Sequence, residues 1–309
     1  MRHRIIHDTV FRYDQPVHES VMEVRLQPGS NERQRCEEFV LTVTPKTVVH
    51  TYVDAAQNII NHFQIPGRLT ELHVSAQSTV DVLLPAPLPN TVPQASWDEY
   101  EAMRATSMLD MMLPSTHTRP SKSLDAFMVE HNIRRDTDPL TTVQNLNTVL
   151  YQTIQYTPQS TTVDSTIEEV LAQRKGVCQD ISHLMIALCR RLGIPARYIS
   201  GYLYHRRIDN DRSQSDATHA WVEVWLPTIG WVGFDPTNNM LTGERHITVA
   251  IGRDYADVTP TRGIYRGLAN EELSVSVRIN DDSTRSPMIQ NTRPTWPTEK
   301  NQQHMQQQQ

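Results

Sequence analysis

The chain has 309 residues, a formal net charge of −6 and a pI near 6.1. This length exceeds the usual size of one hydrophobic core and predicts two domains. The charge argues against a nucleic-acid-binding protein, because phosphate contacts need clustered Lys and Arg side chains. The sequence has no apolar run of about 18 residues to span a bilayer and no signal-peptide pattern, so we expect a cytoplasmic protein without a membrane partner.

Alternating apolar residues predict half-buried strands in the first part of the chain, at residues 22–26, 39–43 and 72–80. Turn-forming residues separate these segments and no helical period interrupts them, so we expect a β-sandwich at residues 1–84. The proline-rich stretch 85–96 lacks the amide hydrogens that regular pairing needs and predicts an extended linker.

Helical periodicity begins after the linker, at residues 97–112, 122–132 and 140–155. Ser165 and Glu168 then have the spacing of a capping box, which predicts the start of a further helix.

Strand-like segments follow at residues 197–203, 219–226, 230–235 and 273–279. We therefore expect an α+β domain with a C-terminal extension at residues 97–279. Residues 280–309 are polar and low in apolar side chains, and we expect them to form a disordered tail.

Three cysteines are too few and too scattered for a disulfide framework. Cys36 lies in a polar turn and Cys189 on a predicted buried helix flank, and neither position favours a reactive thiol. Cys178 lies between a glycine break and the apolar helical face of residues 181–192, so we expect it to begin a helix. A helix N-terminus favours the thiolate, which is the nucleophilic form, although an isolated cysteine is more often a small buried hydrophobe.

Thirteen histidines could supply a base for this thiol. Five of them, His3, His7, His50, His62 and His73, are scattered over the predicted N-terminal strands without the spacing of a zinc site. His219 begins an alternating strand, and a second strand that ends at Asp235 follows after a short turn. Antiparallel pairing would bring Asp235 near His219, so Cys178, His219 and Asp235 predict a nucleophile, a base and a carboxylate that orients the base. No Asp-rich loop suggests calcium, and we expect neither a required metal nor a cofactor.

Four runs closely resemble the transglutaminase-like core of bacterial proteins, at residues 174–184, 193–202, 219–225 and 230–238. They occur in the order of that family, and Cys178, His219 and Asp235 fall on its catalytic positions.

The resemblance extends to both ends of the core. Residues 4–9 and 24–28 resemble the all-β region that often precedes it, and residues 250–258 and 262–267 resemble its C-terminal extension. One departure is the segment from Ala56 to Asn58, where a Gly-Asn turn would be expected.

This resemblance implies a papain-like fold and a thioester intermediate formed from a peptide or protein substrate. Attack by water then gives hydrolysis, as in cysteine peptidases, whereas attack by an amine acceptor gives a new amide bond, as in transglutaminases. The sequence leaves both open; we favour hydrolysis because no acceptor site is legible. A non-catalytic peptide-binding module is a further alternative, disfavoured because all three triad positions are filled. The oligomeric state stays open.

The tetrahedral intermediate also needs hydrogen-bond donors for its oxyanion. We expect the backbone amide of Cys178 to be one donor, with Gln155 or Tyr156 as candidates for the second, although Tyr156 could equally pack against the core. Gln179 and Asp180 are expected to stabilise the helix start.

Overall fold

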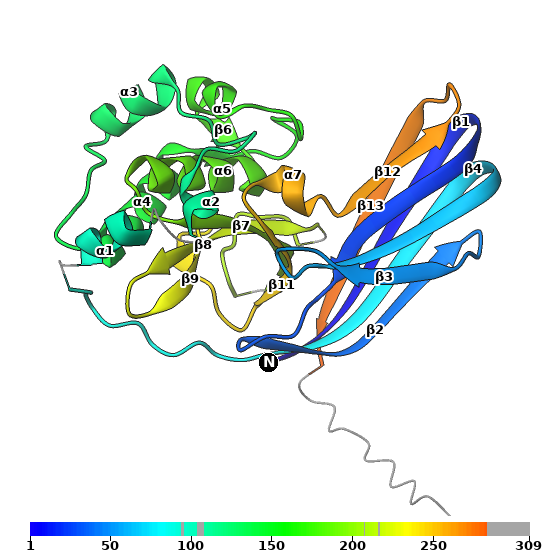
Figure 1. Ribbon diagram of the computed structural model, residues 1–309, viewed down its shortest axis with the longest axis horizontal. Helices are drawn as coiled ribbons and strands as arrows, with labels where there is room; N and C mark the ends of the chain where they lie inside the picture. Colours follow the sequence, from blue (N-terminus) through cyan, green and yellow to red (C-terminus); the bar gives the residue numbers. More distant parts are fainter. Residues whose placement is uncertain (94–95, 104–107, 207, 216, 283–309) are drawn as a thin grey trace, which may run out of the picture.

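The protein has an all-β lobe beside an α+β lobe (Figure 1). The computed structural model describes residues 1–93, 96–103, 108–206, 208–215 and 217–282. The expected α+β class with a β-rich N-terminal region is confirmed. Most of the predicted tail, from residue 283 onward, lies outside the described residues.

The β lobe contains strands β1 (Arg2–Gln27), β2 (Gln34–Thr44), β3 (Val49–Val53), β4 (Ile59–Val82), β12 (Thr261–Arg266) and β13 (Glu271–Asp281). By hydrogen bonding these strands form one sheet, not the two separate sheets of a sandwich. The first half of β1 pairs with β13 and the second half with β12, while β4 follows both halves on the other side. A register shift between Arg12 and Val17 interrupts the β1–β4 ladder. Both halves contribute to one apolar core, for example through Phe11 and Val24.

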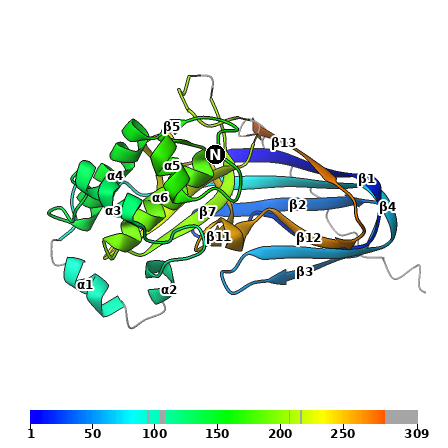
Figure 2. The same ribbon diagram turned by 90° about the horizontal axis from the view of Figure 1, so that it is seen from above.

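The two C-terminal strands correct the predicted domain boundary. Residues 261–279 were expected to belong to the catalytic domain and residues 280 and 281 to the tail, but β12 and β13 pair with β1 and complete the N-terminal sheet. The orange strands accordingly lie against the blue strands in Figures 1 and 2. The reason is that alternation predicts a strand and its buried face, but it does not identify the partner strand.

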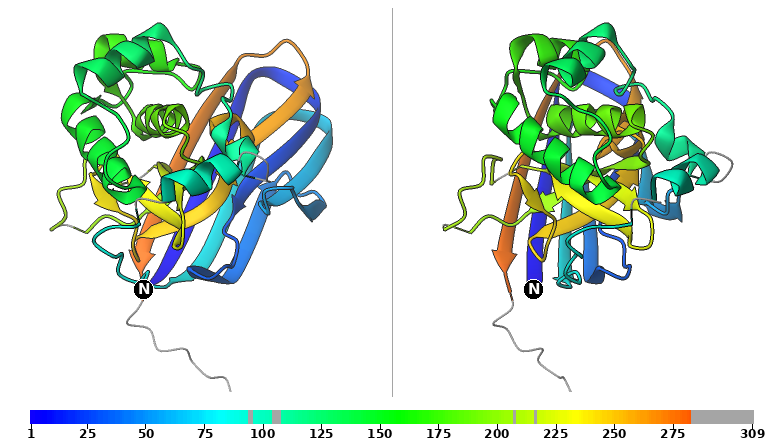
Figure 3. Two further views of the ribbon diagram at one scale, coloured as in Figure 1. Left: turned by 60° about the vertical axis from the view of Figure 1, so that its left-hand side comes forward. Right: turned by 90° about the vertical axis from the view of Figure 1, so that its left-hand side faces the viewer.

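The α+β lobe begins with α1 (Ser96–Met103), α2 (Leu109–Met112), α3 (Lys122–Glu130), α4 (Pro139–Thr153), β5 (Gln155–Tyr156), α5 (Ile167–Gln173), β6 (Lys175–Gly176) and α6 (Cys178–Arg191). It continues with β7 (Ala196–Leu203), β8 (His219–Leu226), β9 (Gly230–Asp235), β10 (Met240–Leu241), β11 (His246–Gly252) and α7 (Tyr255–Val258). Five of these strands form an antiparallel sheet in the order β10-β9-β8-β7-β11. Helix α6 packs on β7 and β8, and Figure 3 shows it in the middle of the lobe. No described helix is long and apolar enough to cross a membrane.

The capping box of α5 lies one residue later than predicted. Thr166 accepts the backbone N–H of Glu169, whose carboxylate accepts the N–H of Thr166. Ser165 instead accepts the N–H of Thr162 in the preceding turn. Both Ser165 and Thr166 have a glutamate three residues later, so spacing alone could not choose between them.

A small apolar cluster joins the lobes, formed by Ile5, Val80, Val82 and Val277 of the β lobe and Tyr202, Ile247 and Val249 of the α+β lobe. Its members are buried. The final strand β13 therefore contributes to the contact between the lobes.

We predict that Val277→Asp lowers the free energy of unfolding by about 3 kcal/mol, because it places an unpaired charge in this cluster. Val277 is 1% exposed, whereas Val275 on the same strand is 46% exposed. The matched variant Val275→Asp should change stability by no more than about 0.5 kcal/mol. Urea denaturation of the two variants decides, and equal losses would contradict the burial of β13 against the α+β lobe.

Candidate active site

Cys178 is the first residue of α6 and is half-buried. The helix starts here because Val177 is extended and its N–H donates to the Asp180 carboxylate at 2.8 Å. Gly176 permits this close approach, since a Cβ at that position would lie 2.9 Å from Cβ of Asp180. The thiol thus lies at the positive end of a helix, where first-turn amides lack intrahelical partners.

The first turn of α6 also holds the loop between β5 and α5. Thr161 donates its hydroxyl to Oδ2 of Asp180 at 2.6 Å, and Nε2 of Gln179 donates to the carbonyl of Val163 at 3.1 Å. Burial raises the pKa of Asp180, although the hydrogen bonds from the Thr161 hydroxyl and the Val177 backbone N–H oppose that effect. Gln179 and Asp180 therefore stabilise the start of α6, which is the role expected from the sequence.

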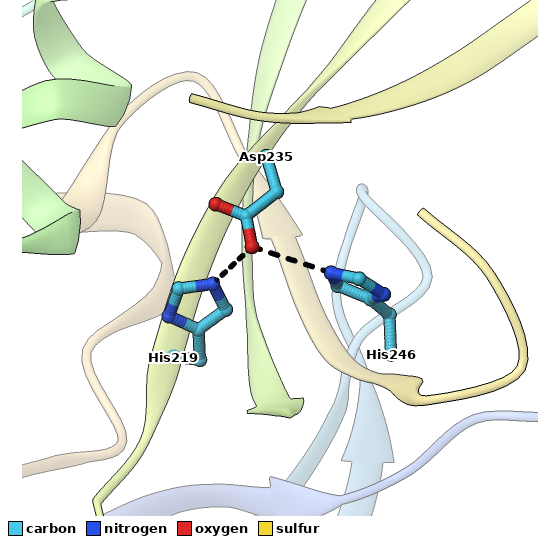
Figure 4. Close-up of side chains that lie close together, drawn as sticks. All are labelled: His219, Asp235 and His246. Carbon is cyan, nitrogen blue, oxygen red and sulfur yellow. Dashed lines mark hydrogen bonds and ion pairs between the residues drawn. The ribbon is translucent and has the colours of Figure 1, made fainter. Parts of the chain in front are cut away.

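His219 and Asp235 form a buried pair at the ends of neighbouring strands (Figure 4). Nε2 of His219 lies 2.7 Å from Oδ2 of Asp235, and the two side chains are 1% and 0% exposed. The same carboxylate oxygen accepts from Nδ2 of Asn238 at 2.8 Å. Its other oxygen accepts the backbone N–H groups of Thr237 at 3.0 Å and Asn238 at 3.2 Å.

These contacts set the charges of the pair. Burial alone would lower the pKa of His219, but the charge and hydrogen bond of Asp235, with a further contribution from Cys178, raise it to about 10. Burial acts in the opposite sense on Asp235, and the interaction with His219 outweighs it and lowers the pKa of the carboxyl. We conclude that the pair is imidazolium and carboxylate at neutral pH. The remaining ring nitrogen of His219, Nδ1, lies on the side away from Asp235 (Figure 4).

A second histidine, His246 at the start of β11, was not recognised from the sequence. Its Nε2 lies 3.4 Å from Oδ2 of Asp235. The backbone N–H of Gly243 donates to Nδ1 at 3.2 Å, so Nδ1 is an acceptor and Nε2 carries the proton that faces Asp235. Burial lowers the pKa of His246, which favours this neutral form. The signal in the sequence was its position at the start of an alternating segment. With twelve other histidines in the chain, this position did not distinguish His246.

His219, Asp235 and His246 offer ligand atoms that lie within 4.8 Å of one another. A metal ion there would compete with the hydrogen bonds that both Nε2 atoms make to Asp235. The proton on Nε2 of His246 fits a hydrogen bond better than a metal ligand. The chemistry of this donor set therefore favours a His–Asp pair with a supporting histidine.

The two proposed side-chain donors for an oxyanion are placed differently. The side chain of Gln155 is exposed, whereas Tyr156 is half-buried and pairs in β5 with Gly176, two residues before Cys178. Burial, followed by the nearby thiol of Cys178, raises the pKa of Tyr156. Its hydroxyl accepts the N–H of Gln214 at 3.4 Å, which leaves its own proton free to donate. Tyr156 is thus the better placed of the two.

The other cysteines are held as thiols. Complete burial raises the pKa of Cys189 to about 12. Cys36 lies in β2 rather than in the predicted turn, and burial with the charge of Glu37 raises its pKa as well.

Known proteins resemble this chain in sequence and in fold. Residues 128–236 match the family model of the transglutaminase-like superfamily, and residues 3–81 match that of the bacterial transglutaminase-like N-terminal region. An uncharacterised protein of Mycobacterium leprae is 34% identical over 279 residues, which cover 90% of this chain and 98% of that protein. A solved structure of a candidate cysteine protease from Cytophaga hutchinsonii covers 91% of both chains with a TM-score of 0.70 at 22% identity. A protein-glutamine gamma-glutamyltransferase of Pseudomonas aeruginosa is 32% identical over 130 residues, which are 36% of this chain and 18% of that protein.

We predict that Asp235→Asn lowers the pKa of His219, because burial remains while the largest charge that opposes it is lost. NMR titration of labelled histidine rings measures this shift. Asp209→Asn is the matched control, since it removes a carboxylate that pairs with Arg245 and leaves the Asp235 contact in place. If His219 titrates alike in both variants, Asp235 does not set its charge.

Proposed function

We propose that this chain, which belongs to the bacterial transglutaminase-like family, catalyses cysteine-dependent acyl transfer on a peptide or isopeptide-like amide. Water is the favoured acceptor, so that the reaction is hydrolysis. The observation that carries the proposal is the buried ion pair of His219 and Asp235 together with Cys178 at a helix N-terminus, whose thiol contributes to the raised pKa of His219. A nucleophile, its base and the group that orients the base are the parts that such chemistry requires.

In the first step the thiolate of Cys178 attacks the carbonyl carbon of the amide. The oxyanion that forms is stabilised by the backbone N–H of Cys178 and by the hydroxyl of Tyr156, which supply the preorganised donors that such intermediates need. The C–N bond then breaks, and the imidazolium of His219 gives the proton from Nδ1 to the departing amine. The product is a thioester on Cys178 and a neutral imidazole.

In the second step the neutral imidazole of His219 takes a proton from water as the water oxygen attacks the thioester. Collapse of this second intermediate releases the acid and restores the thiolate and the imidazolium. Asp235 keeps its charge throughout and holds the ring in one orientation.

Transamidation is the second candidate, and the similarity to the Pseudomonas aeruginosa transferase over 130 residues favours it. The same thioester would then be attacked by an amine in place of water. We favour hydrolysis because water is far more concentrated than any amine, so that transfer requires a site that excludes water and positions the acceptor.

Iodoacetamide should label Cys178 first among the three cysteines, because the thiolate is the reactive form and the pKa values of Cys36 and Cys189 are raised. Mass mapping after brief labelling of the folded protein measures the order. His219→Ala should slow the labelling of Cys178 and leave that of Cys36 unchanged. Faster labelling of Cys36 or Cys189 would contradict the choice of nucleophile.

In a peptide-library assay with and without a labelled primary amine, we expect hydrolysed or deamidated products to dominate. Cys178→Ala should be inactive and His219→Ala should lower kcat about 10³-fold. Asp235→Asn should lose less activity than either, because an amide still orients the imidazole, as in Cys-His-Asn sites. A chelator should leave turnover unchanged. Dominant amine incorporation would replace hydrolysis by transamidation, and activity retained by Cys178→Ala would refute the enzyme mechanism.

A further inference from the structure

The outer strand of the catalytic sheet is completed by side chains of the β lobe. Among the described strands, β11 pairs with β7 alone, and it lies between the two lobes (Figures 1 and 2). On its other side, Gln34 donates to the carbonyl of Thr248 at 2.7 Å and accepts the N–H of Thr248 at 2.8 Å. Asn58 does the same at Ile251, with distances of 2.8 Å and 2.7 Å. Two side-chain amides thus take the place of a neighbouring strand.

Each of these two side-chain amides is also held by a hydrogen bond within the β lobe. Gln34 is 3% exposed and its second amide hydrogen donates to the carbonyl of Gly29 at 2.8 Å. Asn58 is 4% exposed and donates to Asp54 at 3.0 Å. Gln57 adopts a left-handed conformation with φ of 67°, so the turn keeps the geometry for which the family resemblance led us to expect a glycine. The β lobe therefore presents a preorganised clamp.

The clamped strand carries the histidine that supports the catalytic pair. His246 is its first residue, and Nε2 of His3 lies 2.7 Å from the carbonyl of Glu244 just before it. Contacts from the β lobe thus fall on both sides of His246. The ring of His246 packs edge-on against Trp221 at 5.2 Å and faces Asp235 at 3.4 Å. A hydrogen bond of that length weakens with small displacements, so the position of β11 determines its strength.

We propose that the N-terminal β lobe is a working part of the active site, because its clamp on β11 positions His246 against Asp235 and thereby orients His219 toward Cys178. This inference rests on the proposed function and adds a role for the β lobe to it. Gln34, Asn58 and His246 are positioning residues in this account. Small displacements of a reacting group reduce rates strongly, so a contact far from the thiol still affects turnover.

The experiment uses the full chain with the double variant Gln34→Ala/Asn58→Ala and the single variants His246→Leu and His246→Gln. We expect the double variant to lower kcat about 10-fold with little change in KM, and His246→Leu to lower it by up to about 10²-fold. His246→Gln should recover most of the loss, because a glutamine amide can donate to Asp235 in place of Nε2. Gln77→Ala, an exposed glutamine on β4, is the control and should match the wild type.

Two measurements separate this inference from the proposed function. The ring nitrogen shifts of His219 in NMR spectra report its contact with Asp235 whether or not a substrate is turned over, and they should move in the double variant and in His246→Leu. Unchanged shifts and unchanged kcat in folded variants would overturn the inference and leave the proposed function intact. If the variants change the His219 shifts but the wild type neither hydrolyses nor transfers any substrate, the proposed function is refuted while the positioning role is supported.

If the double variant fails to fold, Gln34→Glu provides the test, because a carboxylate still accepts the N–H of Thr248 but cannot donate to its carbonyl. We expect it to lower kcat less than His246→Leu and to shift His219 in the same direction. Wild-type shifts and wild-type kcat in Gln34→Glu would count against the clamp.

Discussion

The carboxylate of Asp235 is the group on which the catalytic half of the molecule depends. It is 0% exposed and accepts five hydrogen bonds, from His219, His246, the side chain of Asn238 and two backbone amides. A buried charge is tolerated only when it is paired and its lone pairs are satisfied, and loss of one partner costs about 3–5 kcal/mol. Strands β8, β9 and β11 and the turn after β9 must therefore all be in place before His219 has a fixed charge and orientation.

The position of Cys178, the proposed nucleophile, depends on separate and more local contacts. Asp180 closes the first turn of α6 and holds Thr161 of the preceding loop, and Gly176 lets that carboxylate approach the backbone. This arrangement needs only residues 161–180, whereas the His–Asp pair draws on segments from His219 to His246. The candidate active site thus joins one locally determined half to one that depends on long-range contacts.

This difference explains what the sequence could predict. The bounds of β8 and β9 agree with the predicted 219–226 and 230–235 because both strands alternate and a short turn leaves few possible registers. The prediction that Cys178 begins a helix likewise needed only the residues next to it in the sequence. By contrast, the pairing of β13 with β1 joins residues more than 250 positions apart, and His246 reaches Asp235 through the fold of a separate strand. Neither partner is encoded in the spacing of nearby residues, so only the structure could identify them.

Strand β11 lies at the edge of its sheet, yet it carries His246, which contacts Asp235. A strand paired on one side has free backbone groups, which invite either fraying or pairing with another chain. In β11 the amides of Gln34 and Asn58 satisfy these groups at two positions without adding a strand. The edge is thereby covered, and the side chain at position 246 can still be a hydrogen-bond donor to Asp235. Because the apolar cluster around Val277 and Ile247 holds the clamp of Gln34 and Asn58 against β11, the packing between the two lobes also affects the geometry of the site.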